Sequence, residues 1–195
     1  MDELKGMEMD TKQLLKLMSH ITNLRHFEKQ LIKEDDLKKL FAAFSYGHSS
    51  IGNQARELIV LDNQTLRERM ISCTLSPYLV NEKGNQSWLK DVPFIGLIVI
   101  ESRRARVRVG DAGVRIAERE AEGALTNFRL VAATLGIGTT VVREFDSQKL
   151  KEALRLPWYL EVASIIAAGY SAEIGRQTQS VQFPVSKIIH KDGWT

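Results

Sequence analysis

A short polar loop, HSSIGNQ at residues 48–54, lies between two apolar segments and holds side chains that could bind a ligand. It brings two serines, a glycine, an asparagine and a glutamine together, which is a dense set of hydrogen-bonding residues for a plain connection. Small residues also let the backbone come close to a bound molecule. These residue types support binding through short-range donors and acceptors, although the same serines would also serve to cap or line a turn.

The side chains that usually carry catalysis form no recognisable motif. The sequence has no G-x-S-x-G elbow and no P-loop, and the GIG at residues 136–138 is not a G-x-G-x-x-G. Cys73 follows Leu66 and Met70 at helical spacing, which predicts a packed thiol in a reducing compartment. No metal-ligand spacing relates Cys73 to the histidines, which are His20, His26, His48 and His190. A cofactor could still carry the chemistry of an enzyme.

Residues 103–115, RRARVRVGDAGVR, contain five arginines. Such a run can bind nucleic acid, but no aromatic residue interleaves with these arginines, and acidic residues follow at once at Glu118, Glu120 and Glu122. We expect no nucleic-acid partner. A basic flap that attracts an anionic small molecule is compatible with the same residues.

The composition is typical of a globular protein. The chain has 195 residues, of which 44% are apolar and 26% are charged, with a formal net charge of +3. We expect one domain over residues 1–195, since this length suffices for a sizeable core. No apolar run approaches the ~20 residues of a membrane helix, and the acidic start MDELKGMEMD lacks the order of a secretory signal. We therefore expect no membrane partner and a cytoplasmic location.

Apolar spacing predicts helices and strands in an α+β order. Helical stripes cover residues 14–21 and 37–44, with Asp35 or Asp36 as the cap of the second helix. The continuous apolar runs at 57–61 and 94–100 indicate strands buried on both faces, and residues 65–75 between them indicate a helix on the sheet. The longest helix covers residues 122–136 and stops at Gly136. A short helix capped by Asp146 and a buried strand at 162–170 follow.

In this order the segments resemble the nitroreductase-like flavin-dependent oxidoreductases, over about residue 14 to Trp194. NLRHFEKQLI is similar to the family's S-x-R-x-F opening, HSSIGNQARELIV to its P-S-S-x-N-x-Q-P-W loop and strand, and WLKDVPFIGLIVI to its W-x-x-D-A-P strand entry. ALTNFRLVAATLGIGTTVVREFD resembles its N-x-x-L-A-A-x-x-L-G-x-G helix and following loop. AAGYSAE and FPVSKIIHKDGW are similar to its last two motifs.

The resemblance implies a nitroreductase-like fold, in which helices flank a central, mostly antiparallel sheet. It also implies an intertwined homodimer with an FMN in each of two interface clefts, and a C-terminal arm, about residues 176–195, that wraps the partner. NAD(P)H would donate electrons. The serine loop and the amide of residue 85 would contact the flavin, the backbone at 143–144 would face flavin N5, and residues 23, 25 and 187 would serve its phosphate. The implied cofactor-binding residues are Asn23, Arg25, Ser49, Ser50, Gly52, Asn85, Arg143, Glu144 and Lys187.

The sequence departs from the family where a phosphate would bind. Ile21 and Thr22 stand before the S-x-R position, and Gln182 and Phe183 stand where a basic pair is expected before Pro184. Arg176 and Lys187 are the basic residues available to replace these phosphate contacts. Alternatives from the residues alone remain open: Asn85 as part of an exposed turn, and Arg25 as an ion-pair partner of Glu28 or Asp36.

Two functions remain after these departures. The first is an FMN-dependent NAD(P)H oxidoreductase that transfers a hydride through flavin N5 to a nitroaromatic, quinone or similar small-molecule acceptor. The second is a divergent family member with weak or no FMN binding that acts as a binding or regulatory protein. The sequence does not distinguish NADH from NADPH.

Overall fold

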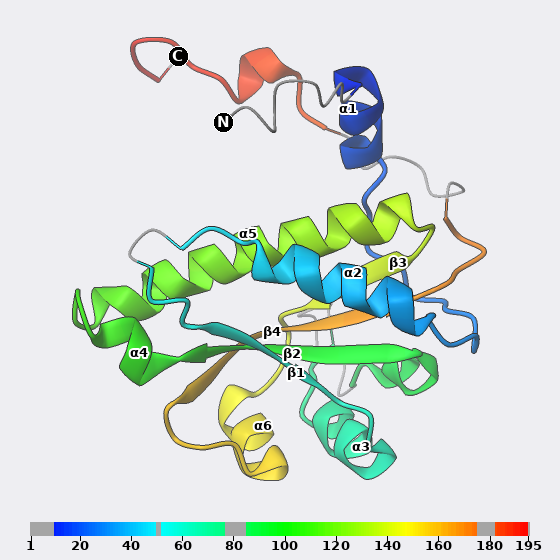
Figure 1. Ribbon diagram of the computed structural model, residues 1–195, viewed down its shortest axis with the longest axis vertical. Coiled ribbons are helices and arrows are strands. Elements are labelled where there is room, and N and C mark those ends of the chain that lie inside the picture. The colour runs from blue at the N-terminus through cyan, green and yellow to red at the C-terminus, as the bar shows by residue number, and fades with distance from the viewer. Residues whose placement is uncertain (1–9, 50–51, 77–84, 175–181, 195) are drawn as a thin grey trace.

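The computed structural model describes residues 10–49, 52–76, 85–174 and 182–194. Helices and strands alternate irregularly along the described chain (Figure 1). In chain order the elements are α1 (Thr11–Ser19), α2 (Glu34–Ser45), β1 (Arg56–Val60), α3 (Gln64–Ser72), the 3-10 helix η2 (Ser87–Asp91), β2 (Phe94–Glu101), α4 (Ser102–Arg106), α5 (Ala112–Thr134), β3 (Gly138–Val142), α6 (Ser147–Leu154), β4 (Leu160–Gly169) and the 3-10 helix η3 (Val185–Lys187).

The described strands form one four-stranded antiparallel sheet in the order β1-β2-β4-β3. β2 and β4 occupy the centre, and every residue of β2 is buried. Side chains of β2 alternate between the two faces: Phe94, Ile98 and Ile100 on one face, and Ile95, Leu97 and Val99 on the other. This alternation explains why the run at 94–100 is apolar throughout, since a central strand covered on both faces has no solvent side.

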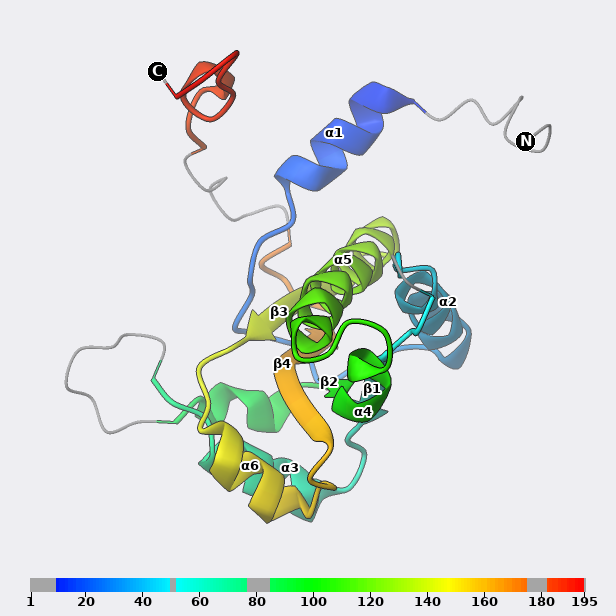
Figure 2. The same ribbon diagram turned by 90° about the vertical axis from the view of Figure 1, so that its left-hand side faces the viewer.

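Helices cover both faces of the sheet, which gives three layers (Figure 2). α5 and α2 pack on the Phe94 face, where Phe128 of α5 stacks on Phe94 with ring centroids 6.0 Å apart. α3, α6 and η2 cover the other face. There Cys73 is buried and donates its Sγ–H to the Arg69 carbonyl, so the predicted packed thiol is confirmed.

Several predicted elements need correction. The run at 57–61 was expected to be buried on both faces, but β1 is an edge strand in which Glu57 and Val60 are exposed. The loop predicted after the longest helix contains a strand instead, since residues 138–142 form β3, the opposite edge of the sheet. The expected cap at Asp35 or Asp36 is wrong, since the cap position is Lys33 and both aspartates lie in the first turn of α2.

The longest helix begins earlier than predicted. α5 starts at Ala112 rather than Glu122, whereas its predicted stop at Gly136 is confirmed by a left-handed φ of +68°. Gly113 lets α5 approach α4, because a Cβ at this position would lie 1.9 Å from the carbonyl oxygen of Ala105. The arginine-rich run therefore forms a tight corner between two helices.

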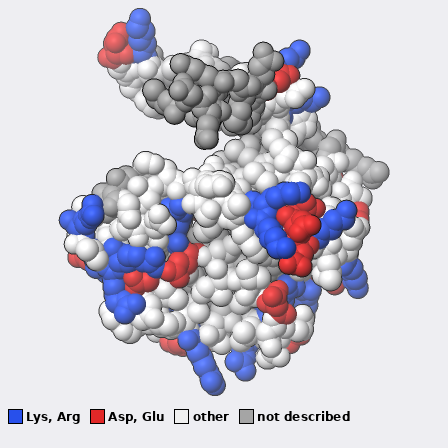
Figure 3. All heavy atoms as spheres, viewed as in Figure 1, with Lys and Arg blue, Asp and Glu red and all other residues white. Residues whose placement is uncertain are grey.

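Charged partners surround the arginine-rich run. Arg103 contacts Glu101 at 2.7 Å and lies over the Tyr159 ring, and Arg104 pairs with Glu57. Figure 3 shows Lys and Arg atoms next to Asp and Glu atoms on this face of the molecule. Positive charge near α4 is thus offset locally, which leaves the expectation of no nucleic-acid partner in place as a prediction.

Both ends of the described chain project from one end of this body. α1 and residues 182–194 extend away from the sheet in Figures 1 and 2. The Phe183–Trp194 part of the predicted C-terminal arm is described, whereas residues 176–181 lie outside the described residues. Among the residues searched, no helix has both the length and the apolar character needed to cross a membrane.

Candidate functional site

The free edge of β3, the one that β4 does not occupy, collects four of the nine predicted site residues, which are Asn23, Arg25, Arg143 and Glu144. Residues 22–24 run beside this edge, where Asn23 bridges Thr139 and the Thr140 hydroxyl donates to the Leu24 carbonyl. Asn23 Oδ1 also lies 3.5 Å from the Val141 backbone nitrogen. These contacts explain why a short strand at the sheet edge is fully buried, and they fix Asn23 against the sheet.

Arg129 of α5 is the central cation at this edge. Its Nε donates to Thr139 Oγ1 at 3.1 Å, and one terminal nitrogen donates to Asn23 Oδ1 at 3.0 Å and to the Thr22 carbonyl at 3.3 Å. Burial lowers the pKa of the Arg129 guanidinium, and the nearby positive charge of Arg143 lowers it further, while Glu122 opposes both effects. The two arginines and one glutamate leave excess positive charge that favours an anion.

Sequence reasoning missed Arg129. A usable signal existed, because Arg129 follows Leu125 by four residues and precedes Ala132 by three, which places it on the apolar face of the longest helix. An arginine on a buried helix face needs partners beyond the helix. Periodicity does not reveal that those partners are Asn23 and Thr139.

Arg143 and Glu144 lie just past the end of β3, and both were predicted. The Arg143 guanidinium pairs with Glu122 at 2.5 Å. The Glu144 carboxylate accepts from the backbone N–H of Arg143 at 3.2 Å and from the side-chain amide of Gln86 at 3.4 Å. The backbone carbonyl of Glu144 accepts from Leu75 at 2.8 Å, so the loop after α3 holds this segment in place.

The side-chain amide that contacts Glu144 belongs to Gln86, the neighbour of the predicted Asn85. Asn85 is exposed, whereas Gln86 is buried and receives a hydrogen bond from the Trp88 indole at 3.2 Å. The Arg25 guanidinium lies 5.9 Å from the centroid of the Trp88 ring, on which Phe27 also stacks. Among the described residues, Arg25 makes no ion pair with the alternative partners Glu28 and Asp36. Arg25 and Gln86 thus reach the same end of the β3 edge.

We call the group formed by these residues the β3-edge cluster. Its members share a position along the free edge of β3 or beside its end, and they provide guanidinium, amide and backbone donors. The cluster comprises Asn23, Arg25, Gln86, Trp88, Arg129, Arg143 and Glu144.

The polar loop lies on the other side of α5. Gly47, which precedes it, approaches Ala124 of α5, and Figure 2 shows β3 and α2 on opposite sides of this helix. Ser49 Oγ accepts from the Gln54 backbone N–H at 3.2 Å, as a turn residue does, and Gly52 has a φ of +65° with open space at its Cβ position. Ser50 lies outside the described residues. One chain therefore does not bring the loop to the β3-edge cluster.

The side chain of Arg56, at the start of β1, holds the beginning of this loop by hydrogen bonds. The Arg56 side chain is 8% exposed and donates to the carbonyls of Ser45, Gly47 and His48 at the end of α2. Burial lowers the pKa of its guanidinium. Because Arg56 donates to the last carbonyl of α2, that of Ser45, and to the carbonyls of Gly47 and His48 just beyond the helix, it sets the direction in which the loop leaves α2.

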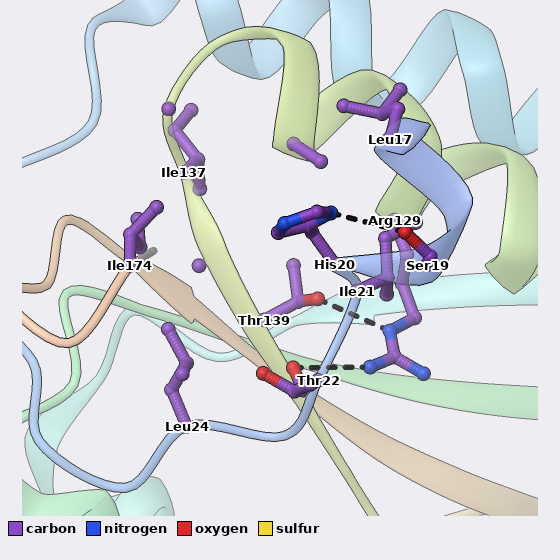
Figure 4. Close-up of a pocket in the computed structure, with 13 residues that line it drawn as sticks. Leu17, Ser19, His20, Ile21, Thr22, Leu24, Arg129, Ile137, Thr139 and Ile174 are labelled. Carbon is purple, nitrogen blue, oxygen red and sulfur yellow. Dashed lines mark hydrogen bonds between the residues drawn. The ribbon is translucent and has the colours of Figure 1, made fainter. Parts of the chain in front are cut away.

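A cavity of about 230 Å³ opens beside Arg129, between the end of α1, the end of α5 and the start of β3 (Figure 4). Figure 4 shows the Arg129 guanidinium turned toward Thr22 and Thr139, with Leu24, Ile137 and Ile174 on the other wall. Ligand pockets typically have volumes of ~300–1,000 Å³. This cavity alone is therefore small for a cofactor. Lys187, the remaining predicted site residue, lies in η3 and is exposed.

Comparison with known proteins identifies the fold. A family model described as the nitroreductase family matches residues 21–170. A comparison with functionally curated proteins found no sequence match.

Several solved structures resemble this one. An FMN-dependent nitroreductase from Clostridium difficile is 19% identical with a TM-score of 0.73, covering 92% of this chain and 99% of that one. The NADPH:FMN oxidoreductase from Vibrio harveyi, complexed with NAD+, is 15% identical with a TM-score of 0.79, covering 93% and 78%. Nitroreductase A from Vibrio parahaemolyticus is 16% identical with a TM-score of 0.80, covering 96% and 77%. The predicted α+β fold with a mostly antiparallel sheet is confirmed.

Proposed function

Because this chain belongs to the nitroreductase family, we propose that it is an FMN-dependent NAD(P)H oxidoreductase that reduces a nitroaromatic, a quinone or a similar acceptor. Family membership implies an oxidoreductase. Relatives in fold include an FMN-dependent nitroreductase and an NADPH:FMN oxidoreductase, which supports the choice of FMN and of a nicotinamide donor.

The chemistry of the β3-edge cluster carries the proposal. A flavin mononucleotide presents a phosphate dianion and a ring edge with carbonyls and ring nitrogens. The cluster offers Arg129, Arg25 and Asn23 for the anion, and the amide of Gln86 and the N–H of Arg143 for the ring edge. This donor set fits the cofactor.

A second copy of the chain would complete the site. Ser49 and Gly52 lie on the far side of α5 from the cluster, so in a dimer their loop would reach a flavin on the partner's β3 edge. Lys187, in the projecting C-terminal segment, would approach a phosphate in the same way. The homodimer and its interface clefts are part of the proposal.

A bound FMN would supply the hydride-transfer chemistry between NAD(P)H and the acceptor. The chain needs no nucleophile for this task. Its residues would bind and orient the cofactor, with Arg129, Arg25 and Asn23 at the phosphate and Gln86 and Arg143 at the ring edge.

Weak FMN binding is the alternative, and specific residues favour it. Two charge-assisted contacts are missing at Ile21–Thr22 and at Gln182–Phe183. At ~1.5–3 kcal/mol each, their loss lowers FMN affinity by ~10²–10⁴-fold. Arg129 offsets part of this loss, since it brings a guanidinium to the backbone of Thr22. Without that offset the protein is a divergent binding or regulatory member of the family.

The visible spectrum of the purified protein tests the proposal. A yellow preparation with flavin bands that bleach on addition of NADH or NADPH, and recover with a quinone, supports the oxidoreductase. A preparation that stays colourless after soaking in FMN and dialysis supports the alternative. Comparing initial bleaching rates with the two nicotinamides identifies the preferred donor.

A further inference from the structure

We propose that the Glu144 carboxylate acts as an internal competitor for the flavin ring, holding the hydrogen-bond donors of the β3 edge until a flavin displaces it. This inference rests on the proposed function and adds a specific role for a residue of this chain. Glu144 thereby sets both the affinity of the site for flavin and the reduction potential of the bound cofactor.

The Glu144 carboxylate accepts from two donors, the backbone N–H of Arg143 and the side-chain amide of Gln86. The last β3 residue paired with β4 is Val142, opposite Ile165, so the backbone N–H of Arg143 lies beyond the ladder. It donates to Glu144 Oε2 at 3.2 Å. The Gln86 amide donates to the same oxygen at 3.4 Å. One carboxylate oxygen therefore accepts from both donors.

The donors are rigid, whereas the acceptor can be exchanged. Gln86 is 3% exposed, its backbone N–H donates to Thr74 Oγ1 at 2.8 Å, and its side-chain oxygen accepts from Trp88. Both hydrogen bonds to Glu144 are longer than the usual 2.9–3.0 Å, which makes them weak. A ligand carbonyl at ordinary distance would replace them with a gain.

The backbone at Glu144 stays in place when its side chain moves. The Leu75 N–H donates to the Glu144 carbonyl at 2.8 Å, and the Asp146 N–H donates to the Cys73 carbonyl at 2.9 Å. Thr74 and Phe145 form a bridge between the same two segments. Because the chain is fixed on both sides of residue 144, withdrawal of the carboxylate needs only side-chain rotation.

The charge of Glu144 also matters to a reduced flavin. Arg143, the neighbouring cation, pairs with Glu122 instead, and Glu144 makes no ion pair with any described residue. Because the backbone on both sides of residue 144 is fixed, the displaced carboxylate stays near the ring. There it opposes the negative charge of reduced flavin more than it opposes the neutral oxidised form. Glu144 therefore lowers the reduction potential of the site.

Three variants separate these effects. Glu144→Ala removes the competing acceptor and its charge, while Glu144→Gln removes the charge and keeps a carbonyl oxygen. Glu152→Gln in α6 is the matched control, because Glu152 is an exposed carboxylate that also accepts from a side-chain amide, that of Gln148 at 3.1 Å. Thermal unfolding of each variant reports whether the fold is kept.

Flavin titration and redox measurements are the readouts. We expect Glu144→Ala to bind FMN and riboflavin about tenfold more tightly than the parent protein, equally for both because the competition concerns the ring. Glu144→Gln should gain less affinity. Both variants should raise the midpoint potential, by about 30 mV if reduced flavin gains tenfold over oxidised flavin. Glu152→Gln should match the parent protein.

The outcomes distinguish this inference from the proposed function. A parent protein that binds flavin, with Glu144→Ala unchanged in affinity and potential, overturns the role of Glu144 and leaves the oxidoreductase standing. Failure of the parent and of all variants to bind either flavin at millimolar concentration removes both. Binding that appears only in the Glu144 variants supports the competition directly.

Discussion

The sheet-and-helix body of this protein buries its large apolar side chains to a far greater extent than its two projecting ends do. In the body, residues 24–174 as described, β2 is buried along its whole length, and large side chains such as Leu40, Ile95 and Phe128 are completely buried. In the ends, none of the described residues of α1 or of 182–194 is buried. Trp194 is 89% exposed and Phe183 is 77% exposed.

This difference indicates which part folds alone. The body has a buried core of its own, although Tyr46 and Trp158 on its surface are also exposed. We therefore expect the body to fold without another chain. The ends expose Leu15 and Met18 on α1 together with Ile188 and Ile189 near the C-terminus. Exposed apolar side chains grouped in this way are typical of surfaces that pack on a partner. The predicted docking of Phe183–Trp194 across a second copy fits this contrast and stays a prediction.

Deleting the C-terminal segment should have the largest effect on the difference between the body and the projecting ends. We expect deletion of residues 183–195 to abolish dimerisation at micromolar concentration and flavin binding with it, because the exposed apolar surface of this segment is lost. The body should still unfold cooperatively. Analytical ultracentrifugation and thermal unfolding measure the two effects, and a truncated protein that dimerises normally would show that the segment is only a tail.

Two aromatic-to-alanine variants, one in the body and one in the C-terminal segment, compare the two regions by their free energies of unfolding. Phe128→Ala should destabilise the protein by ~3–5 kcal/mol, since Phe128 is completely buried and stacks on Phe94. Trp194→Ala should change the stability of the monomer by under ~0.5 kcal/mol. Urea unfolding at two protein concentrations is the measurement.

Concentration dependence separates the two residues further. If Trp194 packs on a partner, the effect of Trp194→Ala appears only at the higher concentration, where the dimer is populated. A large effect at every concentration would mean that Trp194 belongs to the body after all.

The flavin affinities of two variants show whether the projecting ends contribute positive charge to the cofactor site. Arg25→Ala, in the body, should weaken FMN by ~1.5–3 kcal/mol and riboflavin much less, because only FMN carries the phosphate. Lys187→Ala, in the C-terminal segment, should do the same if a partner's end reaches the phosphate. Fluorescence titration of both flavins at two salt concentrations checks this. Equal losses for the two flavins would make Arg25 a structural residue.

The junction between body and ends should weaken slightly in acid. Glu173 accepts from His26 at 2.6 Å, and this hydrogen bond is the largest cause of a Glu173 pKa below its ordinary value of 4.5. Because the folded pKa is the lower one, the contribution is complete above pH 4.5 and is lost as pH falls through the folded pKa. The effect should stay under ~1 kcal/mol, since His26 is exposed.

The stability contributed by ionised Glu173 is measured by comparing the parent protein with Glu173→Gln from pH 7 to pH 3. Their difference in unfolding free energy should shrink below pH 4.5. A difference that persists unchanged at pH 3 would show that the ionised form of Glu173 is not what stabilises the junction.

Local spacing in the sequence determined most elements. Helical stripes marked α1, α2 and the second half of α5, and apolar runs marked β2 and β4, because side-chain periodicity is a property of neighbouring residues. The order of short motifs also identified the family. β3 was missed because its five residues follow directly on a helix stop at Gly136.

Only the tertiary structure decided which residues meet. Arg129 reaches Asn23 across more than a hundred positions of sequence, and Gln86 reaches Glu144 across 58. Sheet order made β1 an exposed edge while β2 became the buried centre, although both are apolar runs in the sequence. A residue's type and spacing determine its own element, whereas its partners depend on how elements distant in the chain pack together.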